Sequence, residues 1–284
     1  DLRTDGLVEI HISLREKRCS RKLMKPNMLR PLIVAHRGAS ALAPENTLAA
    51  FRRAIDDGAE GIEFDVRLAK DGVAVVFHDA TLNRTGLRDG NVADLTSAEL
   101  AKIDIGTWFN KMDRRNANPD FSLQKVSTLP KTLEFLKKFK GRIYIELKCE
   151  LDNFKPLVAA VCDVIRESPL LPQIIVKSFR LAAIPEVRCL LPDVQTAALF
   201  EPSITTILRR REHIIAMAIE FGAGQISLHR ALATDKLCIL ASQANLPVTV
   251  WTVDNARWIT LSRQRSIRAL ITNHPAVLKN RRDS

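Results

Sequence analysis

The feature that most constrains the fold of this chain is a repeated alternation of short apolar runs with longer segments of helical periodicity. Short, wholly apolar runs are typical of strands that are buried on both faces of a parallel sheet. Eight such strands alternating with helices over about 250 residues predict a TIM (β/α)8 barrel, a fold of the α/β class. The predicted barrel strands are residues 32–35, 62–66, 143–147, 173–178, 194–199, 225–228, 247–251 and 268–271.

The helices are predicted between these strands. The first follows Pro44-Glu45-Asn46-Thr47, where Asn46 or Thr47 can cap it, and Leu48 and Phe51 recur at helical spacing. The later helices are predicted at residues 129–140, 154–167, 180–190, 204–221, 233–244, 255–264 and 275–280.

Two irregular features are predicted after the second barrel strand. Residues 73–78 form the returning arm of a β-hairpin. Residues 79–128 have weak periodicity and many polar side chains, so a small insertion of about this span is predicted. Within it, Thr96 and Glu99 have capping-box spacing for a short helix, and residues 104–120 are predicted as a loop.

A length of 284 residues suits one large barrel domain or two small domains, and the regular alternation favours one domain over residues 31–284. Residues 1–30 lie outside the pattern and are strongly basic over 15–25. They contain no apolar run long enough for a signal-peptide core or a membrane span. We expect an N-terminal extension, of cloning origin or flexible, and favour a loose solvated tail over a basic arm that binds membranes.

Glu63 and Asp65 are the first candidate functional residues, because they lie two positions apart in the second predicted strand. Period-two geometry places both on one face of the strand and Ile62, Phe64 and Val66 on the other. Adjacent carboxylates repel each other and are costly to bury unpaired, and a divalent cation such as Mg²⁺ or Ca²⁺ removes that cost. The alternative is an exposed edge strand, which the covered strands of βαβ units disfavour.

The hairpin brings a histidine to these carboxylates. Asp71-Gly72 is a strong signal for a two-residue loop. With that loop Lys70 faces Val73, and counting outward places His78 directly opposite Asp65, with Cβ atoms about 4.5–5.5 Å apart. A histidine so placed is a better catalytic candidate than an isolated one.

The motifs that carry a family resemblance occur in order and at close spacing. They are His36-Arg37-Gly38, Pro44-Glu45-Asn46-Thr47, Glu63-Phe64-Asp65, Phe77-His78-Asp79 and Thr81-Leu82-Asn83-Arg84-Thr85-Gly86. With them the chain resembles the glycerophosphodiester phosphodiesterase family, from about residue 31 to its end. The resemblance implies a TIM barrel whose insertion covers part of the site, and an enzyme that hydrolyses phosphodiesters.

The resemblance also implies roles for residues of the later strands. Glu146 and Lys148 share a face at a strand end, and they match the third metal carboxylate and the phosphate-binding lysine of the family; a purely structural pair is the alternative. Lys177 precedes a segment similar to the family's Ser-Phe motif and is placed near the phosphate. Trp251 would pack against the alcohol part of the substrate, although a large aromatic residue is by default core. His229 faces either the barrel mouth or the surface.

The assembled hypothesis is metal-dependent hydrolysis of a phosphodiester. The resemblance implies attack by the neighbouring glycerol hydroxyl, then opening of the cyclic phosphate by water to give sn-glycerol 3-phosphate and an alcohol such as choline or ethanolamine. Which histidine is acid and which is base is left open, and Glu45 and Asn46 either contact the metal site or cap the helix, with support of the site favoured. The predicted roles are general acid and base for His36 and His78, ligation of one Mg²⁺ or Ca²⁺ for Glu63, Asp65 and Glu146, and phosphate or substrate binding for Arg37, Lys148 and Trp251.

Two alternatives and two departures accompany this hypothesis. The same site could hydrolyse lysophospholipids as a lysophospholipase D, or a degenerate barrel could bind a phosphate ligand without catalysis; the second predicts loss of charged site residues, all of which are present. Asn273 stands where the family commonly has Asp, which puts support of the site in doubt. Lys131 likewise stands where Glu is usual.

Composition narrows the partners and the setting. The net charge of +11 comes from scattered Lys and Arg without a nucleic-acid motif, so we expect no nucleic-acid partner and a field that attracts an anionic substrate. Five cysteines are odd in number and lack metal-type spacing, which favours a reduced, cytoplasmic setting. The family resemblance implies a role in glycerol and lipid metabolism. The oligomeric state is left open.

Overall fold

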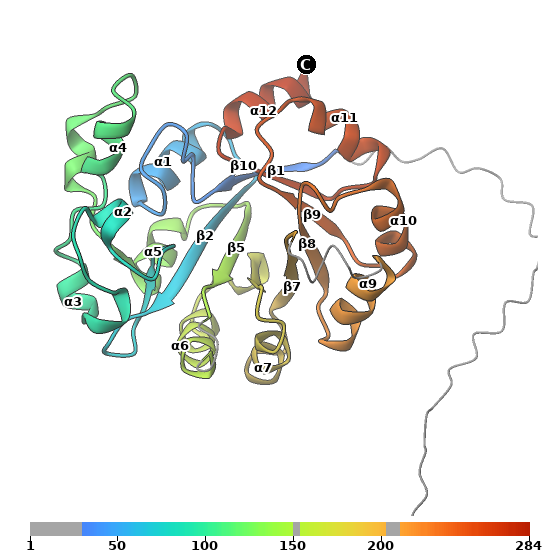
Figure 1. The fold of residues 1–284 in the computed structure, drawn as a ribbon, viewed down its shortest axis with the longest axis horizontal. Coiled ribbons are helices and arrows are strands. Elements are labelled where there is room, and N and C mark those ends of the chain that lie inside the picture. The colour runs from blue at the N-terminus through green and yellow to red at the C-terminus, as the bar shows by residue number, and fades with distance from the viewer. Residues whose placement is uncertain (1–29, 150–153, 203–210) are drawn as a thin grey trace, which may run out of the picture.

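Eight parallel strands close into a barrel in the computed structural model, which describes residues 30–149, 154–202 and 211–284 (Figure 1). Strand β1 pairs with both β10 and β2, which closes the ring, so the predicted TIM barrel is confirmed. The barrel strands are β1 (Leu32–His36), β2 (Gly61–Leu68), β5 (Arg142–Leu147), β6 (Ile174–Ser178), β7 (Gln195–Phe200), β8 (Gln225–His229), β9 (Val248–Trp251) and β10 (Ala269–Thr272).

Helices surround the barrel and bury their apolar faces against its outer surface (Figure 1). The predicted helix at 204–221 corresponds to α9 over the described residues, and residues 204–210, like 1–29, lie outside them. The helices are α1 (Leu48–Asp56), α5 (Leu129–Leu136), α6 (Lys155–Arg166), α7 (Ala183–Leu190), α9 (Arg211–Glu220), α10 (Asp235–Gln243), α11 (Arg257–Gln264) and α12 (Pro275–Asp283).

Helix α1 illustrates how local sequence and packing agree. The side chain of Thr47 accepts a hydrogen bond from the Ala50 amide and caps the helix, so Thr47 and not Asn46 is the cap. Phe51 is fully buried, with its ring 5.5 Å from that of Phe64 on β2. Truncating such a side chain to Ala typically costs about 3–5 kcal/mol, so this contact is a main attachment of α1 to the barrel.

Besides the apolar contacts between the helices and the barrel, a separate apolar cluster lies inside the barrel. Its members come from β1, β5, β6, β7 and β10, with small and large side chains mixed as in other small barrels. The cluster separates the carboxyl ends of the strands from their amino ends. It consists of Val34, Tyr144, Ile175, Ala197, Ala269 and Ile271.

The hairpin after β2 is present, but its predicted register is wrong by one residue. Strand β3 (Ala74–Val76) pairs with β2 so that Val76 faces Val66, and the amide of Phe77, not His78, bonds to the Asp65 carbonyl at 3.0 Å. The reason is a three-residue loop, closed between Ala69 and Val73, in which Gly72 adopts a φ of +77°. Such loops, with glycine in the left-handed region, are the next commonest after two-residue loops.

The insertion is more regular than predicted. It contains short helices α2 (Asn83–Gly86), α3 (Ser97–Leu100) and α4 (Thr107–Met112), with 3-10 turns Val92–Asp94 and Pro119–Leu123, and β4 (Ser127–Thr128) joins its end to β3. The loop predicted over 104–120 therefore contains a helix. The Asp104 carboxylate accepts hydrogen bonds from the amides of Gly106 and Thr107 and begins that helix. The predicted capping box of Thr96 and Glu99 is present.

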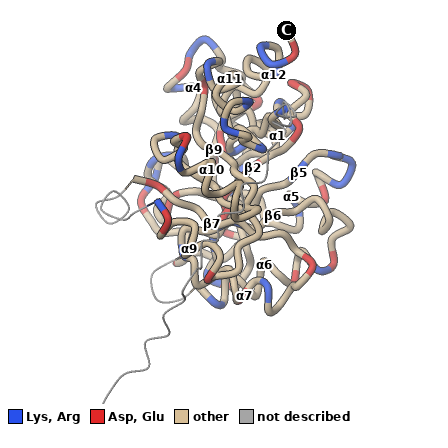
Figure 2. The backbone as a smooth tube through the Cα atoms, turned by 90° about the vertical axis from the view of Figure 1, so that its right-hand side faces the viewer, with Lys and Arg blue, Asp and Glu red and all other residues tan. Residues whose placement is uncertain are grey.

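Charged residues occur at many places along the backbone (Figure 2). Figure 2 shows Lys and Arg at many separate positions of the outer loops and helices, in keeping with the scattered pattern in the sequence. Among the described residues, no helix has both the length and the apolar character that crossing a bilayer requires.

Candidate active site

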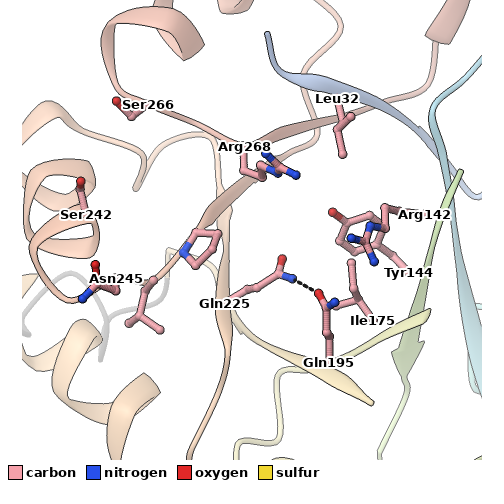
Figure 3. A pocket seen from close by; sticks show the side chains of 12 residues that line it. Leu32, Arg142, Tyr144, Ile175, Gln195, Gln225, Ser242, Asn245, Ser266 and Arg268 are labelled. Carbon is pink, nitrogen blue, oxygen red and sulfur yellow. Dashed lines mark hydrogen bonds between the residues drawn. The ribbon is translucent and has the colours of Figure 1, made fainter. Parts of the chain in front are cut away.

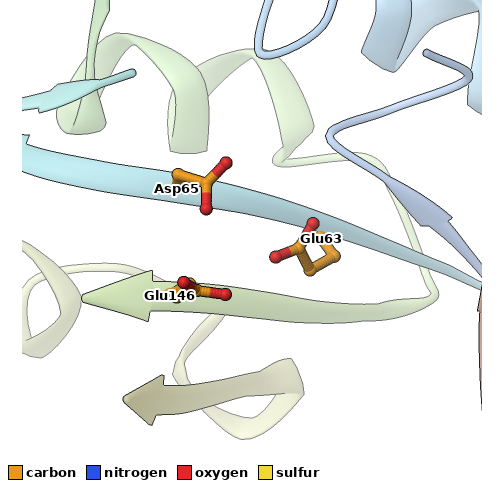
Figure 4. Close-up of side chains that lie close together, drawn as sticks. All are labelled: Glu63, Asp65 and Glu146. Atoms are coloured by element: carbon orange, nitrogen blue, oxygen red, sulfur yellow. The ribbon is translucent and has the colours of Figure 1, made fainter. Parts of the chain in front are cut away.

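Three buried carboxylates converge at the carboxyl ends of the strands. Glu63 and Asp65 come from β2, and Glu146 comes from β5, where it is the register partner of Asp65. Figure 4 shows the three side chains directed toward the same space. One oxygen from each lies within 4.8 Å of the others, and the residues are 0%, 1% and 5% exposed.

Two lysines neutralise much of this negative charge. The Lys177 ammonium from β6 lies 2.8 Å from Glu63 Oε1 and 3.2 Å from Glu146 Oε2, and the residue is 2% exposed. The Lys148 ammonium lies 3.1 Å from Asp65 Oδ1 and also pairs with Glu146. Lys177 was expected near the phosphate, but its ammonium is buried between two of the carboxylates.

These contacts keep Glu63 and Asp65 ionised. Burial, the largest influence on Glu63, would raise its pKa, but the charge and the hydrogen bond of Lys177 act against it and the pKa is lowered overall. Burial would likewise raise the pKa of Asp65, and the charges of Lys148 and Arg37 hold it well below its usual range. Carboxylate oxygens are the donors that Mg²⁺ and Ca²⁺ bind, and three of them converge in this buried cluster, so these side chains fit such an ion.

Arg37 and Asn46 hold the carboxylates from the loop after β1. The backbone amide of Arg37 donates to Glu63 Oε2 at 3.0 Å, and its guanidinium lies 3.2 Å from Asp65 and 2.8 Å from Glu45. The Asn46 amide group donates to Asp65 Oδ2 at 2.9 Å and accepts from the Asp65 backbone at 3.2 Å. Both residues therefore bind the carboxylate cluster directly or through its backbone.

Gly38 explains why this loop can approach α1 so closely. Its φ is +82°, and a Cβ at this position would lie 2.6 Å from backbone and side-chain atoms of Ala50. Any larger residue would push the loop away from the helix and displace the neighbouring Arg37.

His36, at the end of β1, is oriented by a series of hydrogen bonds between side chains. Its Nδ1 lies 2.7 Å from Asn273 Oδ1, the Asn273 amide nitrogen donates to Asp254 Oδ2 at 2.8 Å, and Ser40 Oγ donates to the same Asn273 oxygen. Because Asn273 presents its oxygen to the ring, Nδ1 of His36 carries a proton. Desolvation lowers the pKa of His36, which favours the neutral ring with a free lone pair on Nε2.

His78 has an acidic partner instead. Its Nδ1 lies 2.5 Å from Asp79 Oδ1, and Asp79 also accepts from Arg84 Nε at 2.7 Å. Arg84 donates twice more to Glu45, at 2.7 and 2.9 Å, so the insertion is tied to the carboxylate cluster through Glu45 and Arg37. His78 directly follows Phe77, whose amide bonds to the Asp65 carbonyl, so it lies next to this cluster.

An aromatic group lines another part of the same barrel end. The Trp251 ring, at the end of β9, contacts His229 at 5.3 Å and Phe179 at 5.6 Å between centroids, both edge-to-face. Trp251 and His229 are half-buried, and Phe179 is 39% exposed. His229 is therefore packed against the predicted substrate-contacting tryptophan at the barrel mouth.

The sequence analysis assigned no role to Asp79, Arg84 or Asp254. Asp79 and Arg84 lie inside the motifs that were noted, and the adjacency of His78 and Asp79 was the available signal. No local pattern joins Asp254 and Asn273 to His36, since they come together only when the barrel closes.

Comparisons with known proteins agree with this arrangement. Residues 36–277 match the Glycerophosphoryl diester phosphodiesterase family. A glycerophosphodiester phosphodiesterase of Bacillus subtilis is 31% identical over 88% of this chain and 87% of its own, and one of Caldanaerobacter subterraneus is 28% identical over 89% and 98%. A phosphodiesterase structure from Oleispira antarctica superposes with a TM-score of 0.78 at 24% identity, covering 89% of this chain and 97% of that one. The chain belongs to the glycerophosphoryl diester phosphodiesterase family and is, as its motifs predicted, an enzyme of that phosphodiesterase class.

Proposed function

We propose that this protein hydrolyses glycerophosphodiesters to sn-glycerol 3-phosphate and an alcohol in a metal-dependent reaction. The observation that carries the proposal is the buried cluster of Glu63, Asp65 and Glu146, flanked by two histidines whose Nδ1 atoms are both engaged. The Oleispira antarctica phosphodiesterase was solved in complex with the product sn-glycerol-3-phosphate, which supports the same product here.

Glu63, Asp65 and Glu146 would hold the divalent cation. Bound there, it would stabilise charge on a phosphoryl oxygen and acidify a coordinated hydroxyl. Arg37 and Lys148 supply further positive charge to the phosphoryl group, Arg37 through a planar fork of donors and Lys148 as a point charge. The Lys148 side chain is 15% exposed, so unlike Lys177 it can turn from the carboxylates toward a substrate.

The different partners of the two histidines support an assignment of the acid and the base. His36 faces an amide oxygen and is neutral, so its Nε2 accepts the proton of the attacking glycerol hydroxyl. The Asp79 carboxylate binds Nδ1 of His78 and orients the ring, so we assign its Nε2 as the donor of a proton to the departing alkoxide. Water then opens the cyclic phosphate with the two roles reversed.

The aromatic group at the mouth supports choline as the departing alcohol. Phe179 and Trp251 present ring surface at the barrel mouth, and a quaternary ammonium group is attracted to such surfaces. Glycerophosphocholine is therefore the substrate to test first. Comparing its turnover with that of lysophosphatidylcholine separates this activity from lysophospholipase D activity on the same site.

The test uses the purified full chain with glycerophosphocholine and measures release of sn-glycerol 3-phosphate. We expect EDTA to abolish release, Mg²⁺ or Ca²⁺ to restore it, and His36→Ala and His78→Ala each to lower kcat by about 10²–10⁴-fold. His213→Ala, an exposed histidine on α9, is the matched control and should retain full activity. A folded protein that releases no product with either cation would refute the proposal, and unchanged turnover in either active-site variant would refute the acid–base assignment.

A further inference from the structure

The amino ends of the barrel strands surround a cavity of about 450 Å³, lined by both polar and apolar side chains, that the proposed function does not use. Arg142 and Gln195 begin β5 and β7, Gln225 begins β8, and Arg268 immediately precedes β10. This amino-end pocket has Tyr144 at its floor and is closed on one side by loop residues that include Ser266. Figure 3 shows Arg142, Tyr144, Gln195, Gln225 and Arg268 around a common space, with Ser266 farther out.

The pocket is positively charged without an internal counter-ion. The residues that line it, all in the described part of the chain, include Arg142 and Arg268 and no Asp or Glu. Neither arginine forms an ion pair with any described residue: Arg142 donates only to the Pro172 carbonyl, at 3.0 Å, and Arg268 is exposed. An unpaired arginine pair presents two forks that match phosphate oxygens.

The positive charges of both arginines act on Tyr144 at the floor of the pocket. Burial raises the pKa of the Tyr144 hydroxyl, and the nearby charges of Arg142 and Arg268 oppose that rise. A neighbouring cavity shares both arginines and is lined further by Arg52, Lys137, Lys138 and Lys140 against Glu60 and Glu134, so the surroundings of the pocket are also positive.

Neutral hydrogen-bonding groups complete the lining. Gln225 Nε2 donates to Gln195 Oε1 at 3.0 Å, which leaves the amide nitrogen of Gln195 and the carbonyl of Gln225 for other partners. Ser266 adds a hydroxyl at the exposed rim. These groups can bind the hydroxyls of a ligand whose anionic part is held by the arginines, and the volume suits a small metabolite.

We propose that the amino-end pocket binds a small phosphate monoester that carries several hydroxyl groups, such as a sugar phosphate. The site is distinct from the active site, because the interior cluster of the barrel lies between the two ends. The proposal does not rest on the function proposed above, since binding here requires neither the carboxylates nor the histidines.

The single tyrosine of the chain provides a local reporter, because Tyr144 lines this pocket. Protein labelled with 3-fluorotyrosine would give one ¹⁹F resonance, which is followed while glucose 6-phosphate is added to the full chain in the presence of Mg²⁺. We expect a saturable shift with glucose 6-phosphate and none with glucose. Arg268→Gln should weaken binding at least about tenfold, since it removes a charge-assisted contact, and Arg142→Gln should do the same.

Arg281→Gln is the matched control. Arg281 is exposed near the end of α12, lines neither cavity, and its substitution changes the net charge by the same amount. This variant should bind as the parent does. No saturable shift, an unchanged titration in Arg268→Gln, or equal weakening in Arg281→Gln would overturn the proposal; the last result would show that only the general positive charge attracts the ligand.

Discussion

The two ends of the barrel differ in whether the charged side chains discussed above are buried and ion-paired or accessible and without an ion pair. At the carboxyl ends, Glu63, Asp65 and Glu146 are buried and each is paired with a cation from a neighbouring strand or loop. At the amino ends, Arg142 and Arg268 are accessible and have no ion pair among the described residues. Burying charges costs several kcal/mol per ion even when they are paired, so a cluster at the carboxyl ends is poorly explained by stability alone.

This difference in burial and ion pairing fits catalysis at the carboxyl ends and anion binding at the amino ends. A buried cluster whose carboxylates are paired with cations holds them in fixed positions, which is what a preorganised catalytic site requires. An open pocket with unpaired arginines requires no such preorganisation, because an anion brings the missing charge with it. The following substitutions break individual contacts at one end and use the other end or the surface for comparison.

Lys177→Met should have the largest effect on stability. It removes the ammonium shared by Glu63 and Glu146 and leaves buried carboxylates without that partner. We expect the metal-free protein to lose about 3–5 kcal/mol of unfolding free energy, and saturating Mg²⁺ to return part of it. Urea denaturation with EDTA and with Mg²⁺ measures both values.

Lys137→Met is the control for that prediction. Lys137 pairs with Glu134 on the surface, with side chains 51% and 67% exposed, and such pairs contribute about 0–1 kcal/mol. If the two variants were equally stable without metal, Lys177 would not be compensating buried charge.

Arg84→Gln tests the connection from the insertion to the carboxyl-end site. Arg84 bonds both Asp79, the partner of His78, and Glu45, the partner of Arg37. Loss of such an orienting group typically costs 10–100-fold, and because Arg84 is 43% exposed we expect about tenfold in kcat with KM little changed. Steady-state kinetics on glycerophosphocholine measures the effect.

Arg88→Gln removes the same charge from the same insertion. Arg88 is exposed, and among the described residues its side chain hydrogen-bonds only to the neighbouring Asp89 carbonyl, so activity should not change. An equal loss in both variants would mean that the general charge of the insertion, and not the position of His78, limits the rate.

Asn273→Asp should move the pH dependence of the reaction. A carboxylate 2.7 Å from Nδ1 of His36 stabilises the imidazolium, so the pKa of His36 rises and less of the neutral base is present at acidic pH. The acidic limb of the kcat/KM profile should therefore shift upward by about one pH unit, with little change above it. Asn245→Asp, an equal charge change at the amino ends, should leave the profile in place; a shift in either direction there, or a downward shift in Asn273→Asp, would contradict the assignment of His36 as base.

The sequence was sufficient for the barrel because each strand–helix unit repeats a local pattern, and the motifs placed His36, Glu63 and Asp65 at strand ends. It was not sufficient for contacts that depend on barrel closure. Asn273 meets His36 across 237 positions of the chain, and no periodicity encodes that distance. The predicted hairpin register was wrong because Asp71-Gly72 is compatible with loops of two or three residues, and the local sequence does not distinguish them.

The smallest predicted effect on unfolding free energy is at the amino ends, where stability and not activity should depend on pH. Glu60 pairs there with Arg282, whose side chain is fully buried, and also accepts from the Ile33 amide at 3.0 Å. Burial would raise the pKa of Glu60, but the hydrogen bonds from Arg282 and Ile33 lower it overall. A lowered carboxyl pKa gives stability that is present above the unfolded value of about 4.3 and is lost as pH falls through the folded value.

Glu60→Gln should therefore cost about 1 kcal/mol of unfolding free energy near neutral pH, and this difference from the parent should shrink as the pH falls below about 4. Because Glu60 lies away from the active-site carboxylates, metal should not alter the difference, whereas it should alter that of Lys177→Met. Urea denaturation across this pH range, with and without Mg²⁺, makes the comparison. A difference that grew toward acidic pH would mean that Glu60 is not ionised in the native protein. The attachment of α12 to the start of β1 would then depend on the hydrogen bond from Arg282 to the Pro31 carbonyl and not on the Glu60–Arg282 ion pair.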